Sequence, residues 1–202
     1  PYPLSPDYEC CTGRGFVVAF EPRSGEVAWK FEVGEKPRKL DPPIVIEDAR
    51  GKHVFHYGPS TSSVWSVPSF DEASGTVFFG TDVHNSPRAP TEDDPRNYTK
   101  YSAAVVAVDV ETGKEKWVTQ INTGDIFHLG MSGYDPNTRR YKDCAVGDTP
   151  KVYETSIGGR KERVVGVGCK NGGFYVLRAR DGKRIGNTPI YTGAPEYPLD
   201  PM

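Results

Sequence analysis

Residues 106–117, which read VAVDVETGKEKW, decide the fold because the chain carries this stretch in three versions. An earlier version, residues 18–29, reads VAFEPRSGEVAW, and a later one, residues 175–186, reads YVLRARDGKRIG. Each has an apolar, β-branched run, a polar turn that closes on glycine, and a second run, which predicts a β-hairpin. A repeat of this kind fixes the architecture before any single residue is interpreted.

A tryptophan stands at one fixed place in two of the three hairpins. Trp29 and Trp117 each come four residues after the turn glycine, and Gly186 takes that place in the third version. A large aromatic at a fixed point of a repeated hairpin suggests a wedge between neighbouring sheets. Small sheets repeated around an axis form a β-propeller.

The segments upstream of the hairpins supply the inner strands of the predicted blades. The sequence therefore predicts an all-β fold, a partial β-propeller of about two and a half blades. The outer hairpin of one blade is expected at 14–33, a second blade at about 64–121 and a third at about 149–190. Residues 36–53 and 84–100 are expected to be inserted loops, which are often functional.

Two and a half blades do not close a ring, since propellers typically have four to eight blades. Open strand edges would also invite aggregation. We therefore expect further blades, from the same chain or from another, to complete the circle. The chain starts at Pro1 without an apolar leader, which suggests a processed chain or a fragment.

Charge and hydropathy exclude some classes of partner. The chain has 25 Lys and Arg against 27 Asp and Glu, a formal net charge of −2, so no nucleic-acid partner is expected. No apolar run is long enough to span a bilayer.

The four cysteines indicate an oxidising compartment if they pair. The neighbours Cys10 and Cys11 are either a vicinal disulfide or two thiols that happen to be adjacent. Cys144 and Cys169 are candidates for a second bridge. No CxxCH motif is present, so no c-type haem is attached to this stretch.

The unusual polar and aromatic residues are expected on one face of the propeller. Strand direction alternates within a blade, so the loops between its second and third strands open on the same face as the connections between blades. The residues placed there are Arg14, Trp65, Asp82, Asp125 and Lys170. Plainer roles stay open: packing for Trp65, surface charge for Arg14 and Lys170, and loop capping for Asp125.

Several of these segments resemble the pyrroloquinoline quinone (PQQ) dehydrogenases. Residues 107–117 resemble the repeat of that family, and residues 64–81 resemble the segment with its cofactor-stacking tryptophan. Residues 170–177 are similar to the segment whose lysine or arginine contacts the quinone carbonyls. CCTGRG at 10–15 is especially similar to the polyvinyl-alcohol-dehydrogenase-like branch.

The resemblance implies an eight-bladed propeller with PQQ near its axis, in a periplasmic or secreted protein. Such a protein oxidises an alcohol or polyol by hydride transfer to PQQ and passes electrons to an acceptor such as a cytochrome. By resemblance, Trp65 stacks on PQQ, Lys170 contacts its reactive carbonyl oxygens and Arg14 pairs with a PQQ carboxylate. Cys10 and Cys11 complete the implied cofactor-binding set.

The resemblance also implies a calcium ion and a catalytic base. Asp82 stands one position from the family's asparagine ligand, and Glu9 stands near its glutamate ligand. Asp125 is the one clear acid in the segment that supplies the family's base. The alternative is a non-catalytic propeller of the same repeats that acts as a protein-binding scaffold, which the repeat alone does not exclude.

Overall fold

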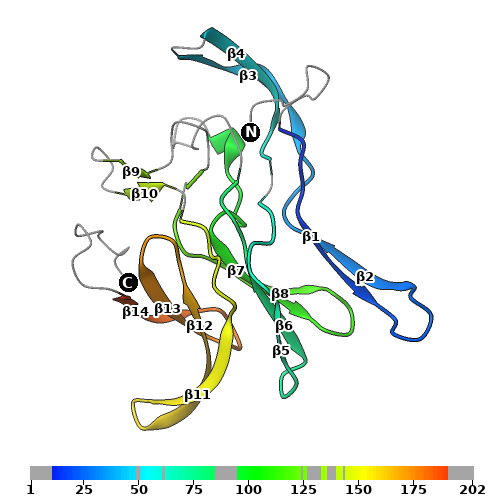
Figure 1. Cartoon of the computed structure of the whole chain (residues 1–202), viewed down its shortest axis with the longest axis vertical. Helices are drawn as coiled ribbons and strands as arrows, with labels where there is room; N and C mark the ends of the chain where they lie inside the picture. Colours follow the sequence, from blue (N-terminus) through cyan, green and yellow to red (C-terminus); the bar gives the residue numbers. More distant parts are fainter. Residues whose placement is uncertain are drawn as a thin grey trace.

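The computed structural model describes residues 11–48, 51–60, 62–84, 95–123, 125–126, 133–135, 140–142 and 144–190. Within these residues the regular structure is β throughout, apart from the single 3-10 turn η1 (Pro95–Asn97). The predicted all-β class is therefore confirmed (Figure 1). No helix in the described part of the chain is long and apolar enough to cross a membrane.

Two four-stranded antiparallel sheets form the centre of the structure, each in simple sequence order. The strands of the first sheet are β5 (Ser69–Asp71), β6 (Thr76–Gly80), β7 (Ala104–Asp109) and β8 (Glu115–Gln120). Those of the second are β11 (Lys151–Ile157), β12 (Arg160–Gly168), β13 (Gly173–Arg178) and β14 (Arg184–Pro189). In both, the repeat forms the last two strands, as its hairpin pattern predicts.

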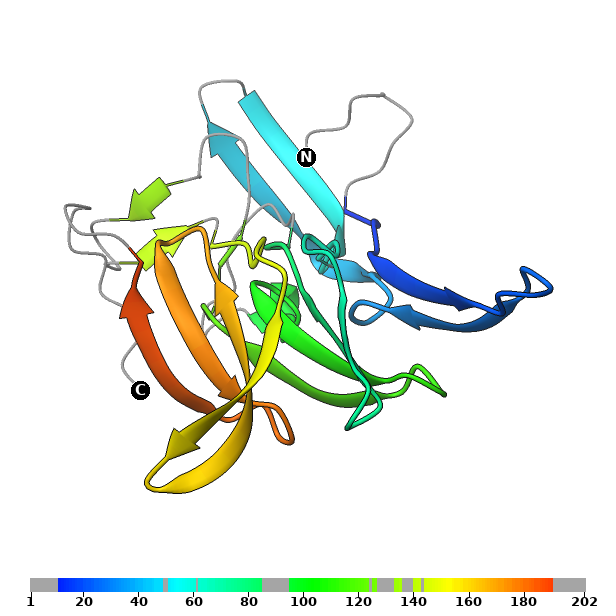
Figure 2. The same cartoon turned by 60° about the horizontal axis from the view of Figure 1, so that its bottom comes forward.

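The first copy of the repeat forms a two-stranded sheet of β1 (Phe16–Phe20) and β2 (Val27–Glu32). The first predicted insertion is not a loop. It contains most of a long hairpin of β3 (Arg38–Asp48) and β4 (Gly51–Gly58), which projects from the rest of the structure (Figures 1 and 2). A short pair, β9 (Gly133–Asp135) and β10 (Arg140–Lys142), lies in the connection between the two larger sheets.

The apolar core lies between neighbouring sheets. One cluster joins the two four-stranded sheets, with Phe78 and Trp117 from the first and Tyr175 and Leu177 from the second. Another cluster lies between the first four-stranded sheet and β1–β2, and includes Phe79 and Val106. The β1–β2 sheet and the two four-stranded sheets are thus stabilised by burial against one another.

The two tryptophans of the repeat are wedges between sheets, as predicted. The Trp29 indole N–H donates to the Val110 carbonyl at 2.7 Å, and the Trp117 N–H donates to the Ala179 carbonyl at 2.9 Å. Each ring packs directly on the turn glycine of the next repeat, and we call this glycine the seat of the ring. A Cβ on Gly113 would lie 2.5 Å from the Trp29 ring, and one on Gly182 would lie 2.6 Å from the Trp117 ring.

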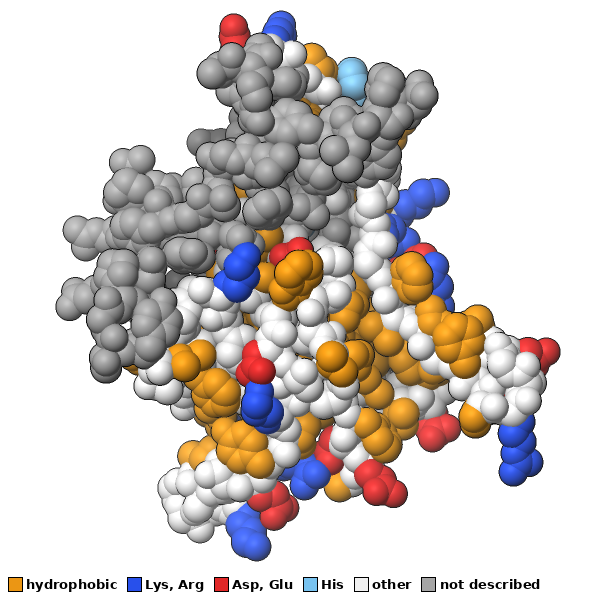
Figure 3. Space-filling model, viewed as in Figure 1, with side chains coloured by type: hydrophobic (Ala, Val, Ile, Leu, Met, Phe, Trp, Pro, Cys, Tyr) orange, Lys and Arg blue, Asp and Glu red, His pale blue; other side chains and the backbone are white. Residues whose placement is uncertain are grey.

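The equivalent seat on the first repeat is bare. Gly25 also has a positive φ, yet no atom of the described residues lies within 4 Å of its ideal Cβ position. Phe16, Phe20 and Val27 of the same hairpin are exposed, and hydrophobic side chains are visible along β1–β2 (Figure 3). This hairpin thus has the two features of the contacts between sheets described above. They are a turn glycine with room for an indole ring, and apolar side chains beside it.

An ion pair adds a polar link between the two larger sheets. The guanidinium of Arg163 on β12 donates two hydrogen bonds to the buried carboxylate of Asp71 on β5, and Ser74 donates a third at 2.5 Å. Burial by itself raises the pKa of Asp71, but these hydrogen bonds and the Arg163 charge outweigh it and lower the pKa below its ordinary value.

We predict that Gly113→Ala destabilises the fold more than Gly159→Ala. Both glycines have positive φ, but a Cβ on Gly159 meets nothing within 4 Å. Gly159→Ala is expected to cost about 1 kcal/mol from backbone strain, and Gly113→Ala roughly 1–3 kcal/mol more from overpacking against the indole. Urea unfolding followed by tryptophan fluorescence measures both. Equal losses would contradict the role of Gly113 as a seat.

Candidate functional site

The long connections between strands gather at one end of the sheets. Figure 1 shows the turns that join β5 to β6, β7 to β8, β11 to β12, β13 to β14 and β1 to β2 in its lower half. The β3–β4 hairpin and the β9–β10 pair lie in its upper half. The predicted functional residues lie in or beside these connections. The candidate site is therefore made of loops that join the ends of the strands.

Trp65 differs from the two wedge tryptophans because its ring is not enclosed by a neighbouring sheet. Its backbone N–H donates to the Gly80 carbonyl at 3.0 Å. Its indole lies against Gly147, where a Cβ would come within 2.8 Å of the ring. The residue remains 56% exposed. The backbone support and the exposed aromatic surface suit a flat ligand that stacks on the indole.

Lys170 is exposed and stands on a tight turn between β12 and β13. Its backbone N–H donates to the Ala145 carbonyl at 3.1 Å. The next residue, Asn171, accepts a hydrogen bond from the Gly173 N–H at 2.9 Å and donates one to the Tyr175 hydroxyl at 2.6 Å. These bonds fix the backbone from which the lysine side chain extends.

Asp125 is buried, and hydrogen bonds hold its carboxylate. Its Oδ2 accepts from the Asn122 side-chain amide at 3.0 Å and from the Cys144 backbone N–H at 2.6 Å. Its own carbonyl accepts from the Ser102 hydroxyl at 2.7 Å. Asp125 thus anchors the connection that follows β8, and this contact ties it to Cys144.

A four-residue segment, Cys144–Gly147, brings these three residues together. Cys144 binds the Asp125 carboxylate, Ala145 binds the Lys170 backbone, and Gly147 supports the Trp65 ring. The segment also reaches the end of β6, since the Val146 N–H donates to the Thr81 carbonyl at 3.0 Å. Its first three residues are fully buried. It therefore serves as a common support for the predicted cofactor face.

Arg14 has protein partners in the structure. Its guanidinium pairs with the Glu32 carboxylate and donates to the Gly34 carbonyl, while its buried Nε has no acceptor among the described residues. The adjacent Gly15 packs on Ser62 and Ser63, two residues before Trp65. Arg14 therefore lies next to the Trp65 segment, but its contact with a PQQ carboxylate stays a prediction.

Of the two predicted metal ligands, the structure describes Asp82. Asp82 Oδ1 accepts the Val83 N–H at 2.8 Å, and Ser63 Oγ lies 3.5 Å from Oδ2. No group of three or more His, Cys, Asp or Glu side chains that could hold a metal was found among the described residues. Glu9 lies outside them. The described residues near Trp65 thus fit a stacked quinone, and a calcium site with Asp82 and Glu9 stays a prediction.

The cysteines support an oxidising environment. Cys144 and Cys169 form a disulfide with a Cα–Cα distance of 5.9 Å, which confirms the predicted second bridge. Cys11 is buried and disulfide-bonded. Cys10, its predicted partner, lies outside the described residues, so their pairing and their place beside a cofactor stay predictions.

Three residues near Asp125 were missed by sequence reasoning: His84, Ser102 and Asn122. Ser102 Oγ accepts the His84 backbone N–H at 3.0 Å and donates to the Asp125 carbonyl. Burial lowers the pKa of His84 from 6.5 to about 3, so its imidazole is neutral at ordinary pH. Their contacts join distant loops, and no local pattern of residues marks such contacts.

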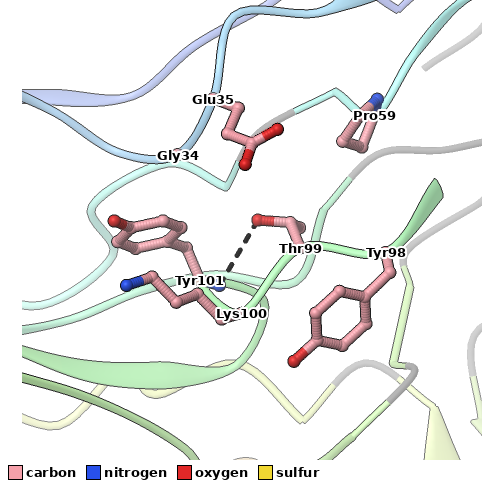
Figure 4. Close-up of a pocket in the computed structure, with 7 residues that line it drawn as sticks. All are labelled: Gly34, Glu35, Pro59, Tyr98, Thr99, Lys100 and Tyr101. Carbon is pink, nitrogen blue, oxygen red and sulfur yellow. Dashed lines mark hydrogen bonds between the residues drawn. The ribbon is translucent and has the colours of Figure 1, made fainter. Parts of the chain in front are cut away.

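A pocket of about 410 Å³ lies between the connections that follow β2 and β4 and the segment that precedes β7. It is lined by Gly34, Glu35, Pro59 and residues 98–101 (Figure 4). Burial, the hydrogen bond to Glu115 and the charges of Glu115 and Glu35 raise the pKa of Tyr101, which therefore stays protonated. None of the predicted cofactor residues lines this pocket.

Comparisons with known proteins identify the kind of propeller. A family model described as the PQQ glucose/ethanol/alcohol dehydrogenase β-propeller domain matches residues 5–190. A polyvinylalcohol dehydrogenase from Pseudomonas sp is 30% identical over 84% of this chain and 24% of its own length. A lupanine 17-hydroxylase [cytochrome c] from Pseudomonas sp is 30% identical over 85% of the chain and 23% of its length.

Solved structures show the same fold. The quinohemoprotein alcohol dehydrogenase from Comamonas testosteroni matches 92% of this chain and 27% of its own, with a TM-score of 0.59 and 20% identity. The chain thus spans about a quarter of the length of the curated relatives it matches. The fold likeness and the family match confirm the predicted partial propeller.

We predict that His84 makes stability depend on pH. Between its ordinary pKa of 6.5 and its folded pKa of about 3, the unfolded chain binds a proton that the folded chain does not. Stability is therefore lost as the pH falls through this window, by about 2 kcal/mol between about pH 7.5 and about pH 5. Urea unfolding at both pH values should show a smaller difference for His84→Gln. Identical pH dependence in the two proteins would contradict the assignment.

Proposed function

Because the chain belongs to the PQQ family of glucose/ethanol/alcohol dehydrogenase β-propeller domains, we propose that it is part of a PQQ-dependent alcohol or polyol dehydrogenase. The single observation that carries the proposal is the exposed Trp65 indole, supported by Gly147 on the same segment that holds Lys170. A propeller that acts only as a scaffold needs no such pair.

In the proposed complex PQQ supplies the two-electron redox chemistry when it is bound. Trp65 provides the flat apolar surface on which the quinone lies. Lys170 carries a positive charge on a fixed turn, where it donates hydrogen bonds to the carbonyl oxygens and stabilises negative charge. The hydrogen bonds around Asn171 keep this backbone in place before the ligand arrives.

Asp125 is proposed as the base that accepts the proton of the alcohol. Its Oδ2 is already fixed by two N–H donors, so the carboxylate has one orientation before substrate binds. Arg14 is proposed to pair with a PQQ carboxylate, as the resemblance implies. Calcium, with Asp82 and Glu9 as ligands, rests on the resemblance alone.

The partners and the compartment are proposed on the same basis. The Cys144–Cys169 disulfide supports a periplasmic or secreted protein, since disulfides persist in oxidising compartments. The bare Gly25 seat and the apolar side chains beside it support a further blade on this side, whose indole would dock as Trp29 does on Gly113. An external acceptor such as a cytochrome would receive the electrons.

PQQ titration of the protein with all its blades present is expected to give stoichiometric binding. Trp65→Ala and Lys170→Ala are each expected to weaken binding by about 10-fold, since each loss is worth about 1.4 kcal/mol. Lys183→Ala, a surface lysine in the opposite turn, is the control and should not change affinity. Cofactor absorbance gives the dissociation constants.

Two results would contradict this proposal. Absence of PQQ binding by the intact protein would favour the non-catalytic scaffold. Binding unchanged in both Trp65→Ala and Lys170→Ala would place the cofactor elsewhere. Dye-linked oxidation of alcohols and polyols, measured with Asp125→Asn as well, tests the catalytic step separately.

The further blade has its own test in Gly25→Ala. If an indole docks on Gly25 in the complete ring, this substitution should destabilise the intact protein as strongly as Gly113→Ala does. If the seat stays bare, the loss should match the smaller one of Gly159→Ala. Thermal unfolding of the three variants in parallel separates these outcomes.

A further inference from the structure

The Cys144–Cys169 disulfide joins two parts of the proposed cofactor face. Cys144 begins the Cys144–Gly147 segment, and Cys169 directly precedes Lys170. Both cysteines are buried in the cluster between the two larger sheets, with side chains such as Val146 and Val167. The bridge thus lies under the loops and away from solvent.

The segment on one side of the bridge makes all three contacts that define the face. The Cys144 N–H holds the Asp125 carboxylate at 2.6 Å, the Ala145 carbonyl holds the Lys170 N–H at 3.1 Å, and Gly147 supports the Trp65 indole. A shift of Cys144 would therefore move the supports of Asp125 and Trp65 relative to the Lys170 turn.

Backbone hydrogen bonds also hold the turn that follows Cys169. Cys169 accepts from the Gly172 N–H and donates its own N–H to the Gly173 carbonyl, both at 2.9 Å, which closes the turn around Lys170. Both of these hydrogen bonds are made by the Cys169 backbone. The disulfide at Cys169 therefore restrains the whole turn.

We propose that the Cys144–Cys169 disulfide is a positioning element for PQQ, which sets Lys170 relative to Trp65. This inference rests on the proposed function. The disulfide does not touch the reacting atoms in this account and undergoes no chemistry in turnover. It acts through the Lys170 backbone, so removing it should weaken PQQ binding by displacing the lysine.

The test is a double-mutant cycle on PQQ affinity in the protein with all its blades present. The four proteins are wild type, Cys144→Ala/Cys169→Ala, Lys170→Ala, and the variant with all three substitutions. Dissociation constants come from cofactor absorbance, at a temperature at which circular dichroism shows every variant folded. Gly113→Ala, which weakens the fold at the distant Trp29 contact, controls for stability alone.

Loss of the disulfide is expected to weaken PQQ binding by about 10-fold when Lys170 is present and by less than about 2-fold when it is absent. Gly113→Ala should leave the affinity unchanged. If the double alanine variant does not fold, Cys144→Ala/Cys169→Val, which refills more of the buried volume, takes its place in the cycle.

The outcomes separate this inference from the function on which it rests. Wild type without PQQ binding would overturn both. Wild type that binds PQQ, together with a disulfide variant of equal affinity, would overturn the positioning role and leave the proposed function standing. Equal weakening with and without Lys170 would show that the bridge does not act through the lysine, and would also overturn the inference.

Discussion

The contact between a tryptophan ring and a turn glycine is the interaction on which the rest of the structure depends. Each of two indoles lies on the glycine of the next repeat and donates one hydrogen bond to the carbonyl three residues before that glycine. The glycine has two duties, since it supplies the positive φ of the turn and leaves room for the ring. The contact therefore fixes both the turn and the placement of the neighbouring sheet.

Fixed sheets make a site from residues far apart in the sequence. Trp65, Asp125 and Lys170 belong to three connections, and each contacts the Cys144–Gly147 segment. The sheets on either side are held by docked indoles, by the Asp71–Arg163 pair and by burial, and the loops are held by their contacts with the Cys144–Gly147 segment. The repeat therefore determines the fold, whereas the segments between repeats supply the residues of the proposed chemistry.

Much of the fold was predictable from the sequence because the residue pattern of each repeat predicts a β-hairpin. The hairpins and the wedge role of Trp29 and Trp117 follow from spacing alone. The β3–β4 hairpin lies largely in residues 36–53, which the sequence predicts as a loop inserted between repeats. Its Pro42 and Pro43 lie at a register shift between Lys39 and Ile44. The Cys144–Gly147 segment has no repeat and no periodicity, so its role depends on tertiary contacts that no local pattern encodes.

PQQ is proposed to lie on the exposed surface of Trp65, within reach of Lys170. The most direct measurement is a crystal structure of the protein with all its blades and with PQQ bound. We predict quinone density parallel to the Trp65 indole, on the side away from Gly147, with the Lys170 ammonium at its carbonyl oxygens. Quinone density elsewhere, or a Trp65 ring covered by another blade, would contradict the account.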